Sequence, residues 1–151
     1  MPDSVLKMTL AVLAVLIFAG FGNRETMASE CIVVPTSESI TTADVIYTGR
    51  VTTIRVGPQF AWPEIEFDVH ERLKGPVSGK TFVLQTPNGK GMDCEGFDFV
   101  VGKDYLVFAA ARYSVTGQPR TYGVGSYQGT ALLDSDEGKQ RLRATRRMIR
   151  K

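Results

Sequence analysis

The candidates for acid–base chemistry in this 151-residue sequence are its single histidine and the acids next to it. The single histidine, His70, stands close to Glu66 and Asp68 in a segment where polar and apolar residues alternate. A general base needs an orienting partner and a pocket, whereas this alternation places the polar side chains on the solvent face of a strand. We therefore expect an exposed surface histidine, and nothing in the sequence supports an enzyme.

Metal and phosphate sites are recognised by the spacing of their ligands, and the sequence lacks the common spacings. It contains no histidine pair and no Cys/His cluster suited to zinc. Gly89 and Gly91 follow no βα unit, so they do not form a phosphate-binding loop. We expect no cofactor and no intrinsic metal site.

Residues 1–28 are typical of a signal peptide. An unbroken apolar run over residues 10–19 follows the weakly basic Lys7, and it is shorter than the roughly 20 residues that span a bilayer. Small residues permit cleavage before Ser29 or before Asn23. We expect an exported protein, secreted or periplasmic, and the alternative is an uncleaved signal that would be its only link to a membrane.

Cys31 and Cys94 are the two cysteines of the chain. Ala28-Ser29-Glu30 precedes Cys31 and does not form a lipid-anchoring box. Export favours one intramolecular disulfide between the two cysteines, which would constrain the unfolded chain by roughly 4 kcal/mol in the entropy description. Two free buried thiols or an intermolecular bridge are the alternatives. Catalysis by Cys94 would require a reduced thiol in an oxidising compartment.

The rest of the sequence predicts a small all-β domain. β-Branched and aromatic runs between Gly/Pro turns predict strands at residues 45–56, 64–73, 80–86 and 105–111 and a short strand at 97–101, and residues 121–125 and 127–133 supply the last strand material. Gly49 inside the first run suggests a bulge or a sharp bend. Five or six strands with no long helix between them indicate an antiparallel barrel or sandwich. In the loop 59–63 we expect Trp62 to form a flap over the core.

Two helical elements flank these strands. Residues 36–44 predict a short helical turn with Thr36 or Ser37 as its N-cap. An N-cap with early acids at residues 134–137 predicts a helix that runs to Lys151 and frays at its basic end. Its expected apolar stripe is narrow and consists of Leu142, Thr145, Met148 and Ile149.

The charge of the chain is unevenly distributed. The net charge of +2 combines a body at residues 29–138, with nine basic and fourteen acidic residues, and a tail from Lys139 to Lys151, with seven basic residues and no acid. Clustered cations attract anionic partners. The tail therefore predicts either an anion-binding surface or a solvated helix face that aids solubility, and we expect no nucleic-acid partner.

A series of short segments, in chain order, carries a resemblance to a known family. The segments are Cys31-Ile32-Val33-Val34-Pro35, residues 43–51, Lys74-Gly75, residues 94–99, residues 101–109 and residues 129–133. In this order they resemble the N-terminal domain of the tissue inhibitors of metalloproteinases (TIMPs) and the bacterial TIMP-like secreted proteins. The resemblance implies an OB-fold, a five-stranded barrel, for a domain at residues 29–133, followed by a basic helix or tail at residues 134–151.

The resemblance also implies how the cysteines pair. In the family the first cysteine bridges to a mid-chain cysteine, which here corresponds to Cys94. A second bridge would join the positions of Val33 and Tyr127, and both of its halves are absent here. This joint loss implies that Cys31 pairs with Cys94.

The inhibitory members of the family imply a mechanism for the segment from Cys31 to Pro35. The free α-amine and the carbonyl of the first cysteine chelate the zinc of the protease, at the position that a catalytic site leaves open. Ile32 would then enter the adjacent specificity pocket, with Val33, Val34 and Pro35 also touching the protease. Chelation requires Cys31 to be the first residue, because Ser29-Glu30 in front would convert the amine to an amide. The alternative is a binding module for an extracellular protein or polysaccharide without inhibitory activity.

Overall fold

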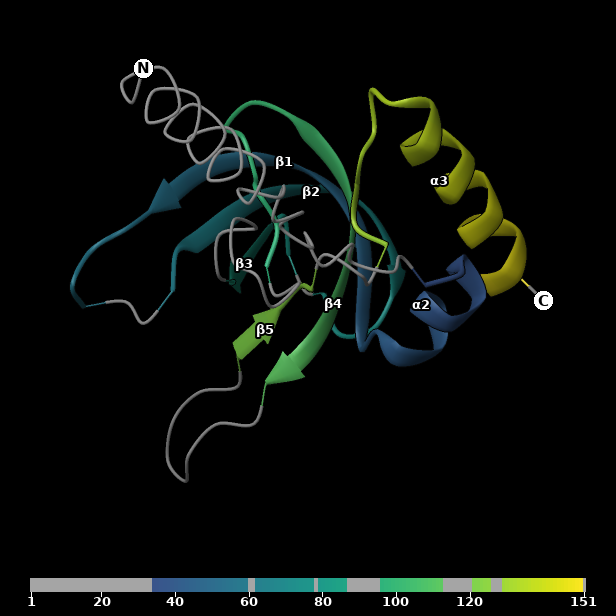
Figure 1. Cartoon of the computed structure of the whole chain (residues 1–151), viewed down its shortest axis with the longest axis horizontal. Helices are drawn as coiled ribbons and strands as arrows, with labels where there is room; N and C mark the ends of the chain where they lie inside the picture. Colours follow the sequence, from purple (N-terminus) through teal and green to yellow (C-terminus); the bar gives the residue numbers. More distant parts are fainter. Residues whose placement is uncertain are drawn as a thin grey trace, which may run out of the picture.

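The computed structural model describes residues 34–59, 62–77, 79–86, 96–112, 121–125 and 129–150. The elements in chain order are α2 (Thr36–Thr42), β1 (Val45–Arg55), β2 (Glu64–Lys74), β3 (Thr81–Gln85), β4 (Asp104–Arg112), β5 (Thr121–Gly123), β6 (Ala131–Leu132) and α3 (Asp136–Ile149). The strands form one antiparallel sheet in the order β3-β2-β1-β4-β5, and β6 pairs with β4. Figure 1 shows this sheet curling strongly, with α2 and α3 together on one side of it. The expected antiparallel sheet is confirmed, in a mostly β structure with two helices.

Irregular pairing between β1 and β2 explains much of the curl. Their register shifts at three points, and one of these shifts, between Thr48 and Gly49, lies where a bulge or a sharp bend was expected. A Cβ at Gly49 would lie 2.8 Å from the carbonyl oxygen of Asp68, so the two backbones approach closely at this point. Bulges bend a strand and increase its twist, and long, bulged strands can therefore wrap around a core.

The curl brings the two ends of the sheet towards each other. Just beyond β3, the Thr86 hydroxyl donates to the carbonyl oxygen of Val124, beyond β5, at 2.9 Å. The rings of Phe82 and Tyr122 lie 5.3 Å apart, centroid to centroid. The neighbours around the curled sheet therefore run β1, β2, β3, β5, β4 and back to β1.

Two apolar clusters lie on opposite sides of β1 and β4. The larger one fills the concave side and includes the fully buried Tyr47 and Phe67, whose rings meet edge to face. The smaller cluster joins Ile46, Leu106 and Phe108 to the two helices. Because alternate residues of β1 and β4 serve different clusters, Val45 to Tyr47 of β1 and residues 105–109 of β4 form unbroken apolar runs where the two strands pair.

Residues 97–101 form an irregular segment, so the expectation of a strand there was wrong. The Phe99 ring packs 5.2 Å from that of Phe67 and 5.0 Å from that of Tyr105, while Val100 is 55% exposed. The Val100 amide donates to the Tyr105 hydroxyl at 3.0 Å. Aromatic packing and the Tyr105 hydroxyl thus hold this segment in place of hydrogen bonds to a neighbouring strand. The expected turn at Gly102 follows it.

The helices differ from expectation at their ends. α2 begins directly after Pro35, which has no side-chain cap, so the predicted caps Thr36 and Ser37 were wrong. In α3 the Ser135 hydroxyl accepts the Gly138 amide at 3.0 Å, and the helix ends at Ile149, short of the expected Lys151.

Two predicted core residues are exposed instead. Met148 is 43% exposed, because the face of α3 that packs on the sheet is narrower than its apolar sequence pattern. Trp62 is 38% exposed and lies beneath the guanidinium of Arg112, 4.0 Å from the ring centroid, so it does not cap the core. Phe60 and Ala61, in the same loop, lie outside the described residues. Within the described ranges no helix is long and apolar enough to cross a membrane.

Candidate functional site

The candidate site is the segment that precedes α2. Val34 is half-buried and Pro35 is exposed at the start of the described chain, and Pro35 accepts the Ser39 amide at 3.0 Å as α2 begins. Cys31, Ile32, Val33 and Cys94 lie outside the described residues. Their contacts and the Cys31–Cys94 pairing therefore remain predictions, and the site is built here from the elements that hold α2.

Lys74 anchors the C-terminal end of α2. Its ammonium donates to the carbonyl oxygens of Ile40 at 2.7 Å and Ala43 at 2.6 Å. The last carbonyls of a helix have no intrahelical partner and carry partial negative charge, so a cation is favourable there. Lys74 sits at the end of β2, and it therefore ties α2 to the sheet.

Gly75 allows β2 to turn closely beneath the same helix end. It has a φ of 82°, and a Cβ there would lie 2.1 Å from the carbonyl oxygen of Asp44. Only glycine meets both conditions, because other residues disfavour this backbone conformation and would collide with the neighbouring backbone.

Asp44 fixes the chain as it leaves α2 and enters β1. Its amide donates to the carbonyl oxygen of Ala109 at 2.9 Å, and its carboxylate accepts the amide of Ala111 at 2.7 Å. Both partners lie on β4, so α2 and β1 are held in register with the most buried strand.

Gly129 closes the arrangement from the other side of α2. It has a φ of 85°, and a Cβ there would approach the Ser39 hydroxyl at 2.9 Å and Nη1 of Arg141 at 2.8 Å. The close fit packs α2, the 129–130 turn and α3 together. We call Asp44, Lys74, Gly75 and Gly129 the α2 clamp. All four fall in the segments that carry the family resemblance, although the sequence did not reveal that they converge on one helix.

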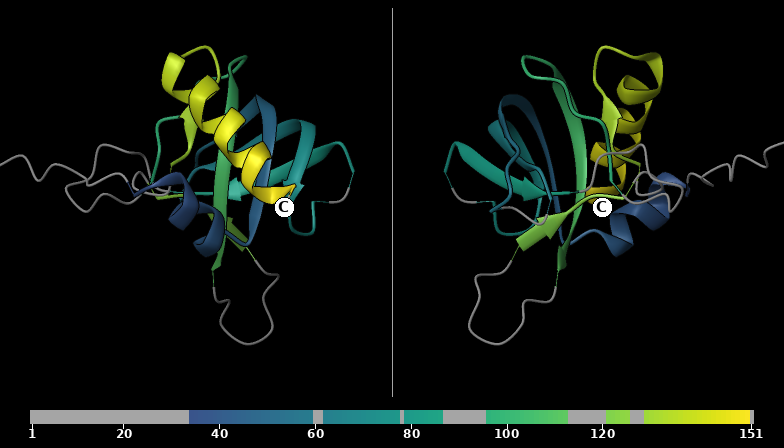
Figure 2. Two further views of the ribbon diagram at one scale, coloured as in Figure 1. Left: turned by 90° about the vertical axis from the view of Figure 1, so that its right-hand side faces the viewer. Right: turned by 60° about the vertical axis from the view of Figure 1, so that its left-hand side comes forward.

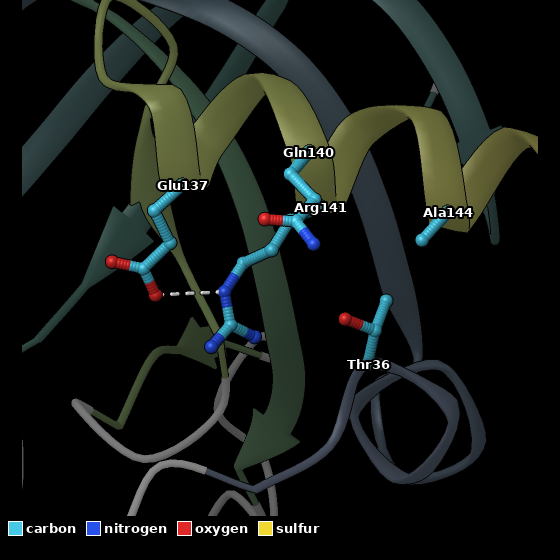
Figure 3. Close-up of a pocket in the computed structure, with 5 residues that line it drawn as sticks. All are labelled: Thr36, Glu137, Gln140, Arg141 and Ala144. Carbon is cyan, nitrogen blue, oxygen red and sulfur yellow. Dashed lines mark hydrogen bonds and ion pairs between the residues drawn. The ribbon is translucent and has the colours of Figure 1, made fainter.

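A cavity of about 220 Å³ lies between α2 and α3 and is lined mostly by polar residues. One of them is Thr36, which directly follows Pro35. Figure 3 shows Thr36 of α2 facing Gln140, Arg141 and Ala144 of α3, with Glu137 beside Arg141. Nε of Arg141 donates to Glu137 at 2.9 Å, while its Nη1 is buried without a hydrogen-bond partner among the described residues. The i,i+4 pair could be found from the sequence, whereas its position beside α2 could not.

His70 is exposed, as expected, and the carboxylate that it approaches belongs to Asp104 of β4. Its Nδ1 lies 3.8 Å from the carboxylate of Asp104, and this carboxylate is bound by Arg50 through Nε at 3.1 Å and Nη2 at 2.7 Å. The hydrogen bond from Arg50 lowers the pKa of Asp104. Asp104 is therefore occupied by Arg50 rather than orienting His70.

Glu64 and Glu66, which lie on the same strand as His70, are both bound by one arginine. Glu64 and Glu66 accept the two terminal nitrogens of Arg55 at 2.5 and 2.6 Å. These hydrogen bonds raise the pKa of Arg55. Across the ranges that the structure describes, no three His, Cys, Asp or Glu side chains come together as metal ligands.

The predicted basic tail forms most of α3. Arg141 pairs with Glu137 and Arg146 pairs with Glu71 of β2, which raises the pKa of Arg146. The remaining described basic residues of the tail are Lys139, Arg143, Arg147 and Arg150, and Lys151 lies outside the described residues.

No protein-family model matches the chain, and a search of curated proteins found no match either.

Proposed function

We propose that this chain is an exported, non-enzymatic TIMP-like binding domain that inhibits a zinc metalloprotease through Cys31-Ile32-Val33-Val34-Pro35. The observation that carries the proposal is the α2 clamp, because it holds the residues directly after this segment on the most buried part of the sheet. An inhibitor gains affinity when its contacting segment is ordered before binding.

The strand neighbours support an OB-fold barrel as the scaffold. An OB-fold is a five-stranded, partly open barrel, and the order β1, β2, β3, β5, β4 around the curled sheet agrees with five strands that nearly close. β6 adds a short pair with Tyr105 and Leu106 at the beginning of β4. Ile32, as the second residue, would enter the pocket beside the protease zinc.

A pair of matched proteins tests the chelation step. One protein begins at Cys31, released by cleavage of a removable leader, and the other carries one additional alanine before Cys31. Only the first has a free α-amine on Cys31, so we expect it to inhibit members of a panel of zinc proteases and the extended protein to lose inhibition. Equal circular dichroism spectra would establish that both are folded. Absence of inhibition by the Cys31-initiated protein, or equal inhibition by both, would contradict the proposal.

The second candidate is a binding module of the same fold without inhibitory activity. It is favoured by the expected cleavage before Ser29, which would leave Ser29-Glu30 in front of Cys31 and block chelation. N-terminal sequencing of the exported protein separates the candidates. A start at Cys31 supports inhibition, whereas a start at Ser29 or Asn23 supports the non-inhibitory module.

A further inference from the structure

The outer face of α3 carries a row of arginine side chains. Arg143, Arg147 and Arg150 are exposed and follow one another at spacings of four and three residues, which places them on one helix face. With Arg146 they line a surface cavity of about 440 Å³. We call these four residues the arginine row. The left-hand view of Figure 2 shows α3 crossing the outside of the sheet, with its C-terminal end towards the viewer.

Most of the charge in this row is not neutralised by neighbouring acids. Arg146 is bound by the carboxylate of Glu71, through Nε at 3.1 Å and also through Nη2. None of the ion pairs between described residues involves Arg143, Arg147 or Arg150. Like charges four residues apart destabilise a helix, so an anion bound along the row would relieve repulsion as well as gain contacts.

The row is mounted on a firmly packed helix. Leu142 and Ile149 contact the smaller apolar cluster, and Thr145 is fully buried between them. Gly138 lies so close to β6 that a Cβ there would be 2.1 Å from the carbonyl oxygen of Leu132. The helix backbone is therefore ordered before any partner binds, which lowers the entropy cost of binding.

The composition of the row favours one class of partner. Guanidinium groups bind sulfate and carboxylate through two parallel hydrogen bonds, with a geometry that lysine lacks. A membrane-surface helix needs exposed apolar residues beside its cations, whereas Leu142 and Ile149 pack inward and Met148 alone among the large apolar residues of α3 is strongly exposed. We propose that the arginine row binds a linear acidic polysaccharide through its sulfate or carboxylate groups. This site uses other residues than Cys31-Pro35 and does not depend on protease inhibition.

Calorimetric titration of the exported protein tests the proposal at several salt concentrations. Heparin offers sulfate and carboxylate, and polygalacturonate offers carboxylate alone, so the two probes identify which group is bound. The variant Arg143→Gln/Arg147→Gln/Arg150→Gln should bind roughly tenfold or more weakly, and the slope of log affinity against log salt should fall by about 2–3. The matched control, Arg72→Gln/Lys80→Gln/Lys103→Gln, removes the same charge from exposed positions on the barrel and should keep most of the affinity.

A measurement on the unsubstituted protein guards against variants that fold poorly. Amide chemical shifts that change with added heparin should map to the outer face of α3. The proposal is overturned if neither polysaccharide binds, if both triple variants lose affinity equally, or if the shifts map elsewhere. Binding to vesicles of phosphatidylcholine and phosphatidylglycerol without binding to either polysaccharide would overturn it in favour of a membrane surface.

Discussion

At the scale of single residues, Thr130 supports the middle of the sheet. Its hydroxyl accepts the Phe108 amide at 3.1 Å, in a fully buried part of β4. Thr130→Val keeps the shape of the side chain but leaves this amide without its acceptor, so the variant should be destabilised by about 1–3 kcal/mol. Urea unfolding measures the effect. Thr52→Val removes an exposed hydroxyl that donates to the backbone carbonyl oxygen of Glu66 at 3.2 Å, and it should change stability by less than about 0.5 kcal/mol. Equal effects of the two substitutions would contradict the role of Thr130.

The Arg50–Asp104 pair makes stability depend on pH. The hydrogen bond from Arg50 lowers the folded-state pKa of Asp104 from its usual 3.8. A depressed carboxylate pKa stabilises the protein above the unfolded-state pKa, and the contribution is lost as pH falls through the folded-state value. Asp104→Asn should therefore be less stable than the wild type at about pH 7, with a difference that shrinks below about pH 4.

The matched substitution Arg50→Gln should reproduce this pH profile, since it removes the other half of the same pair. Both side chains are partly solvated, with Arg50 53% exposed, so added salt should reduce the effect. Chemical unfolding at a series of pH values measures it. A stability difference that stays constant down to about pH 2 would show that Asp104 acts by other means.

At the scale of elements, two glycines separate the cost of a positive φ from the cost of a steric collision with neighbouring backbone. Gly75 and Gly79 have nearly the same φ, 82° and 80°, but a Cβ would meet the Asp44 carbonyl at Gly75 and nothing within 4 Å at Gly79. Gly79→Ala should cost about 1–2 kcal/mol for the backbone conformation alone. Gly75→Ala should cost about 2–5 kcal/mol, because the collision of the new Cβ with the Asp44 carbonyl adds to the cost of the backbone conformation. Thermal unfolding compares them, and equal losses would mean that the close approach at Gly75 is relaxed at little cost.

The sequence was sufficient to predict the elements whose conformation follows from local residue patterns. Alternation, β-branched or apolar runs and turn residues were sufficient for β1 to β4, and a register shift between β1 and β2 lies at Gly49, where a bulge or a sharp bend was expected. The errors occurred where tertiary contacts decide. Phe99 is held by the Phe67 and Tyr105 rings instead of a strand partner, and Met148 is left outside the packed face of α3.

The candidate site was less accessible to sequence reasoning than the fold. Lys74-Gly75 and residues 43–51 were noted as separate segments, but their meeting depends on the β1–β2 register and its shifts. The two hydrogen bonds from Lys74 to the carbonyl oxygens of Ile40 and Ala43 join residues more than thirty positions apart. Neither periodicity nor spacing encodes a contact of that kind.

At the scale of the whole molecule, charge separates the barrel from α3. The body carries an excess of acids, whereas the last thirteen residues carry seven basic residues and no acid. Arg146 joins these two parts by its bond to Glu71 on β2. The other three arginines of the row are exposed to solvent. The ion pair that helps to hold α3 on the sheet therefore leaves most of the positive charge of the row free to bind a partner.

The predicted Cys31–Cys94 disulfide would affect the stability of the whole molecule, because it would tie the segment before α2 to the middle of the chain. If the bridge forms, alkylation of the unfolded, unreduced protein should detect no free thiol, and reduction should lower the free energy of unfolding by up to roughly 4 kcal/mol. The double variant Cys31→Ser/Cys94→Ser should match the reduced wild type and should not respond to reductant. Two free thiols in the exported protein would refute the bridge. Because the chain has only these two cysteines, a loss of stability on reduction without intermolecular dimers on a gel would locate the bridge at this pair.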